Sequence, residues 1–417
     1  MQQGTAMIRG GFPYRHRGRW ILLAILTVAC MARLLLITRL DNRLIYSDEI
    51  KNVALAARLA AGAGYTLDDG RPTAIIPAGY PLWLAALRLI GLSEPVEVRF
   101  VQIGVSLLTL FVLYLFAHSL FGARAALLAA AGGALYPYFI LLPGTILATT
   151  LFSLQLVLAS WLYIKAINTN NNKLLFFDGV IWGWAILTVT TAGVLVGATL
   201  VWHAGHARYS WRLFFRQAGL YLAGIALLVL PWMARNQMAM GRPVLASNGG
   251  YNLWLGNNPD SDLEEPCSQP TPPEMDERII RSGSELYADS LFSATARTWI
   301  KAHPALFLRR TLLKALYFWR LDPSPVTASY LRAGPWTRIA GLLAFAPLLA
   351  LAFLGCRKAP AALKKSLGLF LYYAAAFTAV HALMIVKVRF RLPLDHLLIM
   401  TAAYGLTTVW SSRRKHL

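Results

Sequence analysis

Residues 20–40 form a long apolar run, WILLAILTVACMARLLLITRL. A helix needs roughly 20 apolar residues to cross a hydrocarbon core of about 30 Å, and this run is long enough. Four arginines precede it: Arg9, Arg15, Arg17 and Arg19. The run is too long for the apolar part of a cleaved signal peptide and lacks a clear small-residue cleavage site. It therefore predicts a retained first span, with residues 1–19 on the cytoplasmic side.

The composition agrees with a membrane protein that spans the bilayer several times. Of 417 residues, 57% are hydrophobic and 14% are charged, whereas a soluble protein carries about 25% charged residues. The net charge of +21 is explained by basic residues beside cytoplasmic helix ends, and no nucleic-acid-binding signature accompanies it. Three cysteines predict neither a disulfide framework nor a thiolate metal site. We predict an all-α polytopic membrane protein.

The apolar runs predict about ten spans. They cover residues 20–40, 98–118, 124–142, 146–166, 174–189, 191–205, 213–232, 336–356, 366–386 and 392–410. The stretch 174–205 is too long for one ordinary helix, so we predict two short helices that turn near Thr190 and Thr191. This leaves a cytoplasmic tail at residues 411–417.

Charge supports this arrangement. Every connection assigned to the cytoplasm is basic, as the positive-inside rule expects. Of the 19 acidic residues, seven lie in residues 41–97 and nine in 233–300. We therefore predict two external segments, 41–97 and 233–335, which separate the first span, a bundle at 98–232 and the spans within 336–410.

Shorter apolar stretches in both external segments predict helices that lie on the membrane surface or re-enter it. After Asp48, five apolar residues recur at the spacing of one helix face: Ile50, Val53, Ala54, Ala57 and Ala60. Residues 80–92 and 304–319 are short for spans, and the second carries three basic side chains.

Asp48 and Glu49 in YSDEIKN (46–52) are the first candidates for chemistry. Adjacent residues on a helix point about 100° apart, so at most one carboxylate can face a shared pocket. Such a carboxylate can act as a general base toward a hydroxyl or amine. The alternative is a helix N-terminus, with Ser47 or Asp48 as N-cap and Glu49 in the first turn.

A second group of candidates lies in IIPAGYPLW (75–83) and in the segment 230–259. Pro77, Gly79 and Pro81 predict a turn before an apolar helix that closes a pocket, with Tyr80 in its wall. Arg235, just beyond a span, could hold a lipid-linked phosphate or could be an ordinary interfacial anchor. Asn236 and the Gly- and Asn-rich loop that follows, with Asn252 and Asn257, suit contact with a polar ligand or tight turns.

The segment KVRFRLPLDH (387–396) places Lys387, Arg389 and Arg391 at an external helix end, where the positive-inside rule disfavours them. An anionic substrate, or simply bound anionic lipid, would explain this cluster. Arg33 inside the first span either reaches the membrane surface or pairs with an external acid. His303 is either a hydrogen-bonding pocket residue or structural.

No cofactor is firmly predicted. Four acidic residues resemble a hard-cation loop only loosely, because the EF-hand glycine and terminal glutamate are missing: Asp260, Asp262, Glu264 and Glu265. We assign no metal ligand, and a divalent cation stays an open alternative.

In this order the motifs resemble the GT-C membrane glycosyltransferases, in particular the glycosyltransferase family 39 group. The quoted features are the Asp-Glu pair after the first span, P-x-G-Y-P, PW-x-x-RN, N-G-G…G-N-N-P, A-H-P-x-L-F-x-R-R and R-F-R-L-P. The group includes protein O-mannosyltransferases and the lipid A aminoarabinose transferase. The resemblance covers most of residues 20–410.

The resemblance implies transfer of a sugar from a polyprenyl-phosphate carrier, such as undecaprenyl phosphate, to a glycolipid, glycan or protein acceptor outside the membrane. It implies that Asp48 is the catalytic base, and that Lys51 and Arg235 bind the donor phosphate. Such an enzyme would act in the plasma membrane on cell-envelope glycans or lipopolysaccharide. The main alternative is a transporter or flippase of lipid-linked sugars, which would favour inverted repeats and charges near the bilayer midplane.

Overall fold

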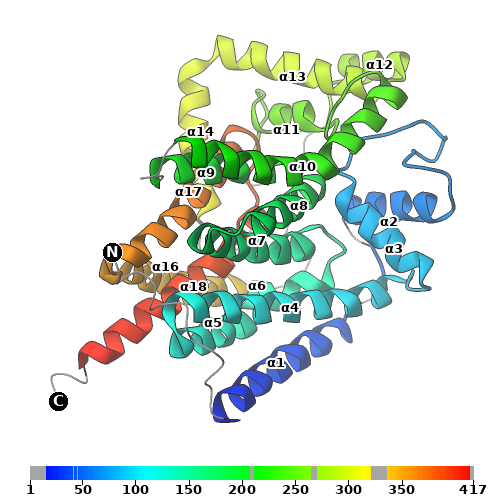
Figure 1. The fold of residues 1–417 in the computed structure, drawn as a ribbon. Helices are drawn as coiled ribbons and strands as arrows, with labels where there is room; N and C mark the ends of the chain where they lie inside the picture. The colour runs from blue at the N-terminus through cyan, green and yellow to red at the C-terminus, as the bar shows by residue number, and fades with distance from the viewer. Residues whose placement is uncertain are drawn as a thin grey trace.

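The computed structural model describes residues 16–40, 42–44, 46–206, 211–263, 270–320 and 336–413. Within these ranges the chain is helical, and its one β-type contact is a bridge between Thr66 and Pro72 (Figure 1). The all-α prediction is confirmed. Several residues singled out above lie outside the described ranges: Arg9, Arg15, Glu264 and Glu265.

Six of the described helices are long and apolar enough to cross a membrane. They are α1 (His16–Ile37), α4 (Pro95–Phe121), α7 (Thr149–Thr169), α10 (Trp211–Met240), α16 (Trp336–Lys358) and α17 (Ala361–Leu383). A seventh span is obtained if α5 (Ala123–Leu135) is joined to α6 (Pro137–Leu141) and η1 (Leu142–Gly144) across a 60° bend. The bend lies at Pro137, because the residue before a proline disfavours helical geometry. The predicted count of ten is not confirmed.

The predicted break within 174–205 is present. Helix α8 (Asn172–Thr188) ends just before Thr190, and α9 (Ala192–His206) begins just after Thr191. Each is shorter than the roughly 20 residues of an ordinary span. The final helix, α18 (Val388–Arg413), is 26 residues long but carries Arg389, Arg391 and Asp395 in its first turns.

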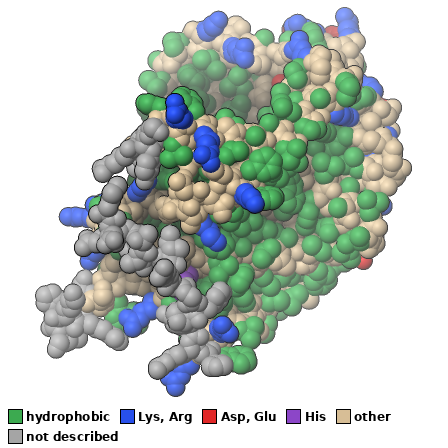
Figure 2. Space-filling view, viewed as in Figure 1, with side chains coloured by type: hydrophobic (Ala, Val, Ile, Leu, Met, Phe, Trp, Pro, Cys, Tyr) green, Lys and Arg blue, Asp and Glu red, His purple; other side chains and the backbone are tan. Residues whose placement is uncertain are grey.

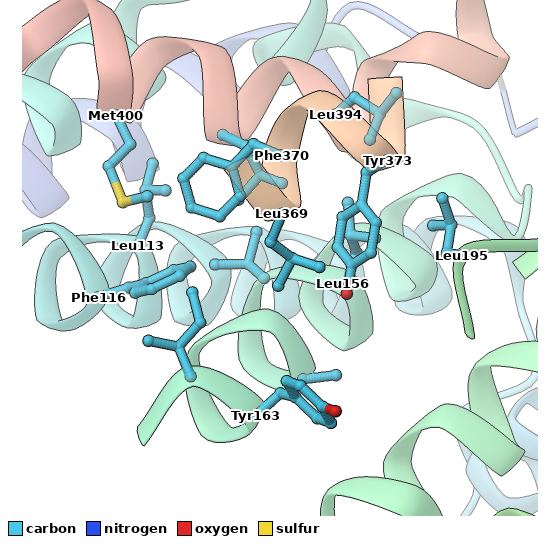
Figure 3. Packing of buried hydrophobic residues seen from close by; sticks show 14 of the residues in the cluster. Leu113, Phe116, Leu156, Tyr163, Leu195, Leu369, Phe370, Tyr373, Leu394 and Met400 are labelled. Atoms are coloured by element: carbon cyan, nitrogen blue, oxygen red, sulfur yellow. The ribbon is translucent and has the colours of Figure 1, made fainter. Parts of the chain in front are cut away.

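The main core lies between α4, α7, α8, α9, α17 and α18. Figure 3 shows side chains from several of these helices interdigitating: Leu113 and Phe116 of α4, Leu156 and Tyr163 of α7, Leu195 of α9, Phe370 and Tyr373 of α17, and Leu394 and Met400 of α18. Helices α8 and α10 approach closely at two glycines. A Cβ at Gly179 would lie 2.1 Å from the Tyr221 carbonyl oxygen, and one at Gly224 would lie 2.1 Å from that of Phe176. Small residues at such crossings are typical of helix packing in membranes.

The outer surface of the bundle is apolar. Large side chains such as Leu35 on α1, Leu108 on α4, Phe215 on α10 and Leu343 on α16 are exposed. Figure 2 shows one face as a broad hydrophobic area with lysines and arginines along its margins. A surface of this extent marks contact with lipid or protein. Together with the long apolar helices, it identifies an integral membrane protein.

Arg33 corrects a prediction. The side chain is fully buried, so it neither reaches the membrane surface nor pairs with an external acid. Its guanidinium donates hydrogen bonds to the Ser106 hydroxyl (2.9 Å), to the Ala29 carbonyl (3.0 Å) and to the Ala134 carbonyl (3.4 Å). These bonds tie α1 to α4 and α5.

The short helices gather in two groups outside the long ones. Helices α2 (Ser47–Ala60) and α3 (Gly79–Leu89) form one pair, and α11 (Gly249–Gly256), α12 (Pro273–Ser282), α13 (Glu285–Ala302) and α14 (Pro304–Phe318) form the other, with α11 to α13 at the top of Figure 1. The helix predicted after Asp48 exists as α2. Leu55 and Ala56 are buried, and Ile50 is exposed.

Glu285 joins the two groups of short helices. Its carboxylate accepts hydrogen bonds from the Thr73 hydroxyl (2.6 Å), the Ala74 amide (2.7 Å) and the Ser247 hydroxyl (2.8 Å). One acid therefore holds the start of α13 against both the segment before α3 and the segment before α11.

Candidate active site

The N-terminus of α2 separates the two neighbouring carboxylates. Glu49 is fully buried; its Oε2 accepts from the Tyr46 amide (3.0 Å) and its Oε1 from the Ile146 amide (2.8 Å). Tyr46, and neither Ser47 nor Asp48, is the N-cap residue. Glu49 therefore anchors the helix start to the chain before α7. This corrects the prediction that Glu49 is catalytic, because both of its oxygens hold backbone amides.

Asp48 points elsewhere and meets α18. Its Oδ2 accepts from the Arg389 guanidinium at 2.6 Å, across 341 positions of sequence. The side chains are 45% exposed for Asp48 and 26% exposed for Arg389, so the pair is reachable from outside the protein. Arg389 also lies over the ring of its neighbour Phe390, 5.4 Å from the centroid.

The charges around Asp48 keep it ionised. Partial burial raises the pKa of Asp48, but the Arg389 ion pair, followed by Lys387 and Lys51, outweighs burial, and the pKa of this carboxyl falls below its usual value. Lys51 is exposed one turn further along α2. The site is thus one carboxylate with three cations around it, where α2 meets the start of α18.

Tyr46 also belongs to this site, and sequence reasoning missed it. Burial raises the pKa of Tyr46 to about 12, Arg389 lowers it and Glu49 raises it. The phenol is therefore neutral and can donate a hydrogen bond. In the sequence, the feature that could have pointed to Tyr46 was its position directly before Ser47, Asp48 and Glu49.

Arg391 is not part of the exposed cluster. It is fully buried and pairs with the equally buried Asp395 at 3.0 Å. Its guanidinium also donates to the carbonyls of Phe318 (3.2 Å) and Arg320 (2.8 Å). Residues two apart on a helix point in nearly opposite directions. This corrects the prediction that Arg391 binds the donor phosphate.

Arg235 is likewise engaged within the protein. It donates to the carbonyls of Tyr65 (2.5 Å) and Thr73 (2.9 Å) and to the Asn236 side chain (2.8 Å), and it lies over the rings of Tyr65 and Trp232. It clamps α10 to the segment between α2 and α3. In this structure Arg235 therefore has a structural role, and its contact with a donor phosphate stays a prediction.

The predicted pocket residues lie in four different settings. Tyr80 is buried and donates to the Gln102 side chain (2.9 Å). Asn236 is buried and donates to the Val244 carbonyl (2.7 Å). Asn252 is half-buried on α11. His303 is exposed at the start of α14, where its ring stacks on Trp299.

Asn257, the remaining predicted pocket residue, is fully buried and donates to the carbonyls of Leu253 and Leu383, both at 2.8 Å. The structure therefore gives Tyr80, Asn236 and Asn257 protein partners instead of an open pocket. Among the residues that the structure describes, no cluster of three or more His, Cys, Asp or Glu side chains could hold a metal. The chemistry available at Asp48 is that of a base beside an anion site.

Part of the chain matches a known protein family. Residues 77–234 match the family model of dolichyl-phosphate-mannose-protein mannosyltransferase. This segment runs from before α3 into α10, and it contains neither Asp48 nor Arg389. No curated protein matches the chain.

Solved structures resemble the chain at low sequence identity. The archaeal oligosaccharyltransferase AglB from Archaeoglobus fulgidus, in complex with an inhibitory peptide and a dolichol-phosphate, has a TM-score of 0.57 and 15% identity, over 95% of this chain and 51% of that one. The chain thus spans about half the length of that protein. ArnT from Cupriavidus metallidurans, bound to undecaprenyl phosphate, has a TM-score of 0.46 and 16% identity, over 88% and 77%. The likeness to the oligosaccharyltransferase confirms the predicted GT-C fold.

Proposed function

We propose that this chain is a GT-C glycosyltransferase that moves a sugar from a polyprenyl-phosphate carrier to an acceptor at the outer face of the membrane. The observation that carries the proposal is the contact between Asp48 and Arg389. It places an ionised carboxylate beside a cation that can bind phosphate, outside the long apolar helices. The match of residues 77–234 to a mannosyltransferase family supports the same chemistry.

In the proposed reaction, the donor phosphate binds Arg389 with help from Lys387 and Lys51, and releases Asp48 from its ion pair. Asp48 then takes the proton from an acceptor hydroxyl or amine. The acceptor atom bonds to the anomeric carbon while the bond from that carbon to the phosphate oxygen breaks. This single displacement inverts the anomeric centre.

The leaving polyprenyl phosphate departs with the bonding electrons, and the cations stabilise its growing charge. Phosphate is a good leaving group, so no general acid is required. The Tyr46 phenol, close to Arg389, can donate a hydrogen bond to the donor or acceptor.

The distribution of charge supports the proposed sidedness. Basic residues concentrate in the connections assigned to the cytoplasm, and 16 of the 19 acids fall in the segments that carry the short helices. Asp48 lies in the first of these segments. The predicted position of this segment at the bilayer surface would suit a donor that is itself a lipid.

The test uses the purified protein in nanodiscs with a panel of polyprenyl-phosphate sugars and acceptors. Mass spectrometry follows the release of free polyprenyl phosphate for wild type, Asp48→Asn and the control Asp68→Asn, which changes an exposed acid of the same external segment. Acceptor-dependent release that only Asp48→Asn abolishes, with donor binding retained, is the expected result. Full activity of Asp48→Asn would remove Asp48 as the base. Donor binding without turnover across the panel would favour a carrier-lipid transporter instead.

A further inference from the structure

Lys314 on α14 is a buried cation that the proposed reaction does not use directly. Its side chain is 2% exposed, and its ammonium donates to the carbonyls of Met384 (2.9 Å) and Gly256 (3.2 Å) and to the Asn257 side-chain oxygen (3.2 Å). The described residues place no carboxylate in ion-pair contact with it. A buried charge held only by neutral oxygens is costly. Accordingly, burial, and then Arg310, lowers the pKa of Lys314 to about 8.

Three neighbouring groups converge on the same junction between α17 and α18. Lys314 holds the Met384 carbonyl, and the Asn257 amide holds the Leu383 carbonyl at 2.8 Å. Gly256 lies so close that a Cβ there would be 1.8 Å from the Met384 oxygen. Met384 itself leaves the helix, with φ −109° and ψ −111°. The junction is therefore held in one arrangement by the end of α11 and by α14.

The junction leads directly into the proposed phosphate site. Lys387 follows Met384 after two residues, and Arg389 is the second residue of α18. A shift of the junction would move both cations relative to Asp48, which is held independently through α2. Because catalytic groups must be placed closely, a misplacement of about 1 Å can cost about 100-fold in rate.

We propose that Lys314 is a positioning residue that holds the α17–α18 junction so that Lys387 and Arg389 face the donor phosphate beside Asp48. This inference rests on the proposed function. It assigns the buried Gly-Asn-Asn-Pro loop a role in placing the cations, instead of contact with a polar ligand.

The experiment is a double-mutant cycle between Lys314→Met and Arg389→Gln in the full-length protein in nanodiscs. It measures the Kd for undecaprenyl phosphate and the kcat/KM for the donor. Lys314→Met keeps the apolar length of the side chain and removes its three donors. We expect it to lower kcat/KM by about 10- to 100-fold, to weaken the Kd by a similar factor, and to have little further effect when Arg389→Gln is present.

Two variants provide the comparison. Lys314→Arg retains charge and donors and should bind the carrier lipid more tightly than Lys314→Met. Arg309→Met makes the same kind of change at an exposed position of α14 and should leave both quantities at the wild-type level. If Lys314→Met is not recovered folded, Asn257→Ala replaces it in the cycle, because it removes the bond to Leu383.

The inference is overturned if Lys314→Met binds and turns over donor as the wild type does. It is also overturned if the loss in the double variant equals the product of the losses in Lys314→Met and Arg389→Gln to within about twofold. That result is expected when the two substitutions act independently. Wild-type protein that binds undecaprenyl phosphate without transferring sugar overturns the proposed function while the Kd arm still tests Lys314. Wild-type protein that does not bind it overturns both.

Discussion

Replacing Arg389 by glutamine should impair the reaction far more than the fold. In the Asp48–Arg389 pair the side chains are 45% and 26% exposed, so water already solvates much of both charges. An exposed ion pair contributes about 0–1 kcal/mol to stability, and Arg389→Gln should cost no more than that. In the proposed transition state the same guanidinium stabilises the leaving phosphate, and removing one such donor lowers kcat by about 100- to 1,000-fold.

Arg391→Gln is the matched control, because it makes the same substitution two residues later on α18. Arg391 and Asp395 are both fully buried. Removing one partner of a buried pair leaves the other charge without compensation and costs roughly 3–5 kcal/mol. The two neighbouring arginines should therefore give opposite results, one losing turnover and the other losing stability.

The assay measures thermal unfolding in detergent and polyprenyl-phosphate release per folded molecule, for wild type and both variants. Arg389→Gln should unfold close to the wild-type temperature with turnover nearly lost, whereas Arg391→Gln should unfold well below it. The reasoning is refuted if Arg389→Gln unfolds as early as Arg391→Gln, or if it retains wild-type turnover.

Three further results are expected. Lys387→Gln should move the acid limb of the pH profile of kcat/KM to higher pH. Lys387 helps to hold the pKa of Asp48 below its usual value, and the ionised base is lost as the pH falls through that pKa. An acid limb at the wild-type pH would show that Asp48 does not control it. Gly179→Ala should abolish recovery of folded protein. The control Gly193→Ala should not, because a Cβ at Gly193 meets nothing within 4 Å. Equal yields of the two variants would contradict the close contact between α8 and α10. Glu285→Gln should lower thermal stability by about 1–3 kcal/mol, since three hydrogen-bond donors lose a charged acceptor, and an unchanged unfolding temperature would count against this junction.

Much of the architecture could be predicted because it depends on local composition. Apolar run length identified the long helices, and the length of 174–205 identified the break that the structure has between Thr188 and Ala192. The count of ten spans is not confirmed, because α8 and α9 are shorter than an ordinary span and α18 carries charged residues in its first turns. The run 124–142 counts as one span only if the chain crosses the membrane with a 60° bend at Pro137.

The candidate site was predicted from the sequence only in part, for two different reasons. Asp48 and Arg389 were selected separately, but nothing in the sequence pairs residues 341 positions apart. Arg235 is held by the backbone carbonyls of distant residues, which leave no pattern of side chains to read. Arg391 is different, because its spacing of four from Asp395 is the spacing of a helical ion pair and could have separated it from Arg389.

The distance in sequence between Asp48 and Arg389 bears on biogenesis. Chains are synthesised at about 5–20 residues per second, so roughly 17–70 s pass between translation of the two residues. Throughout this interval a nascent chain already contains α2 but has no α18 to complete the pair. A polypeptide whose insertion stalls before α18 therefore carries an unpaired carboxylate and no assembled anion site. Under the proposed function, a chain without α18 has no assembled catalytic pair and cannot consume carrier lipid.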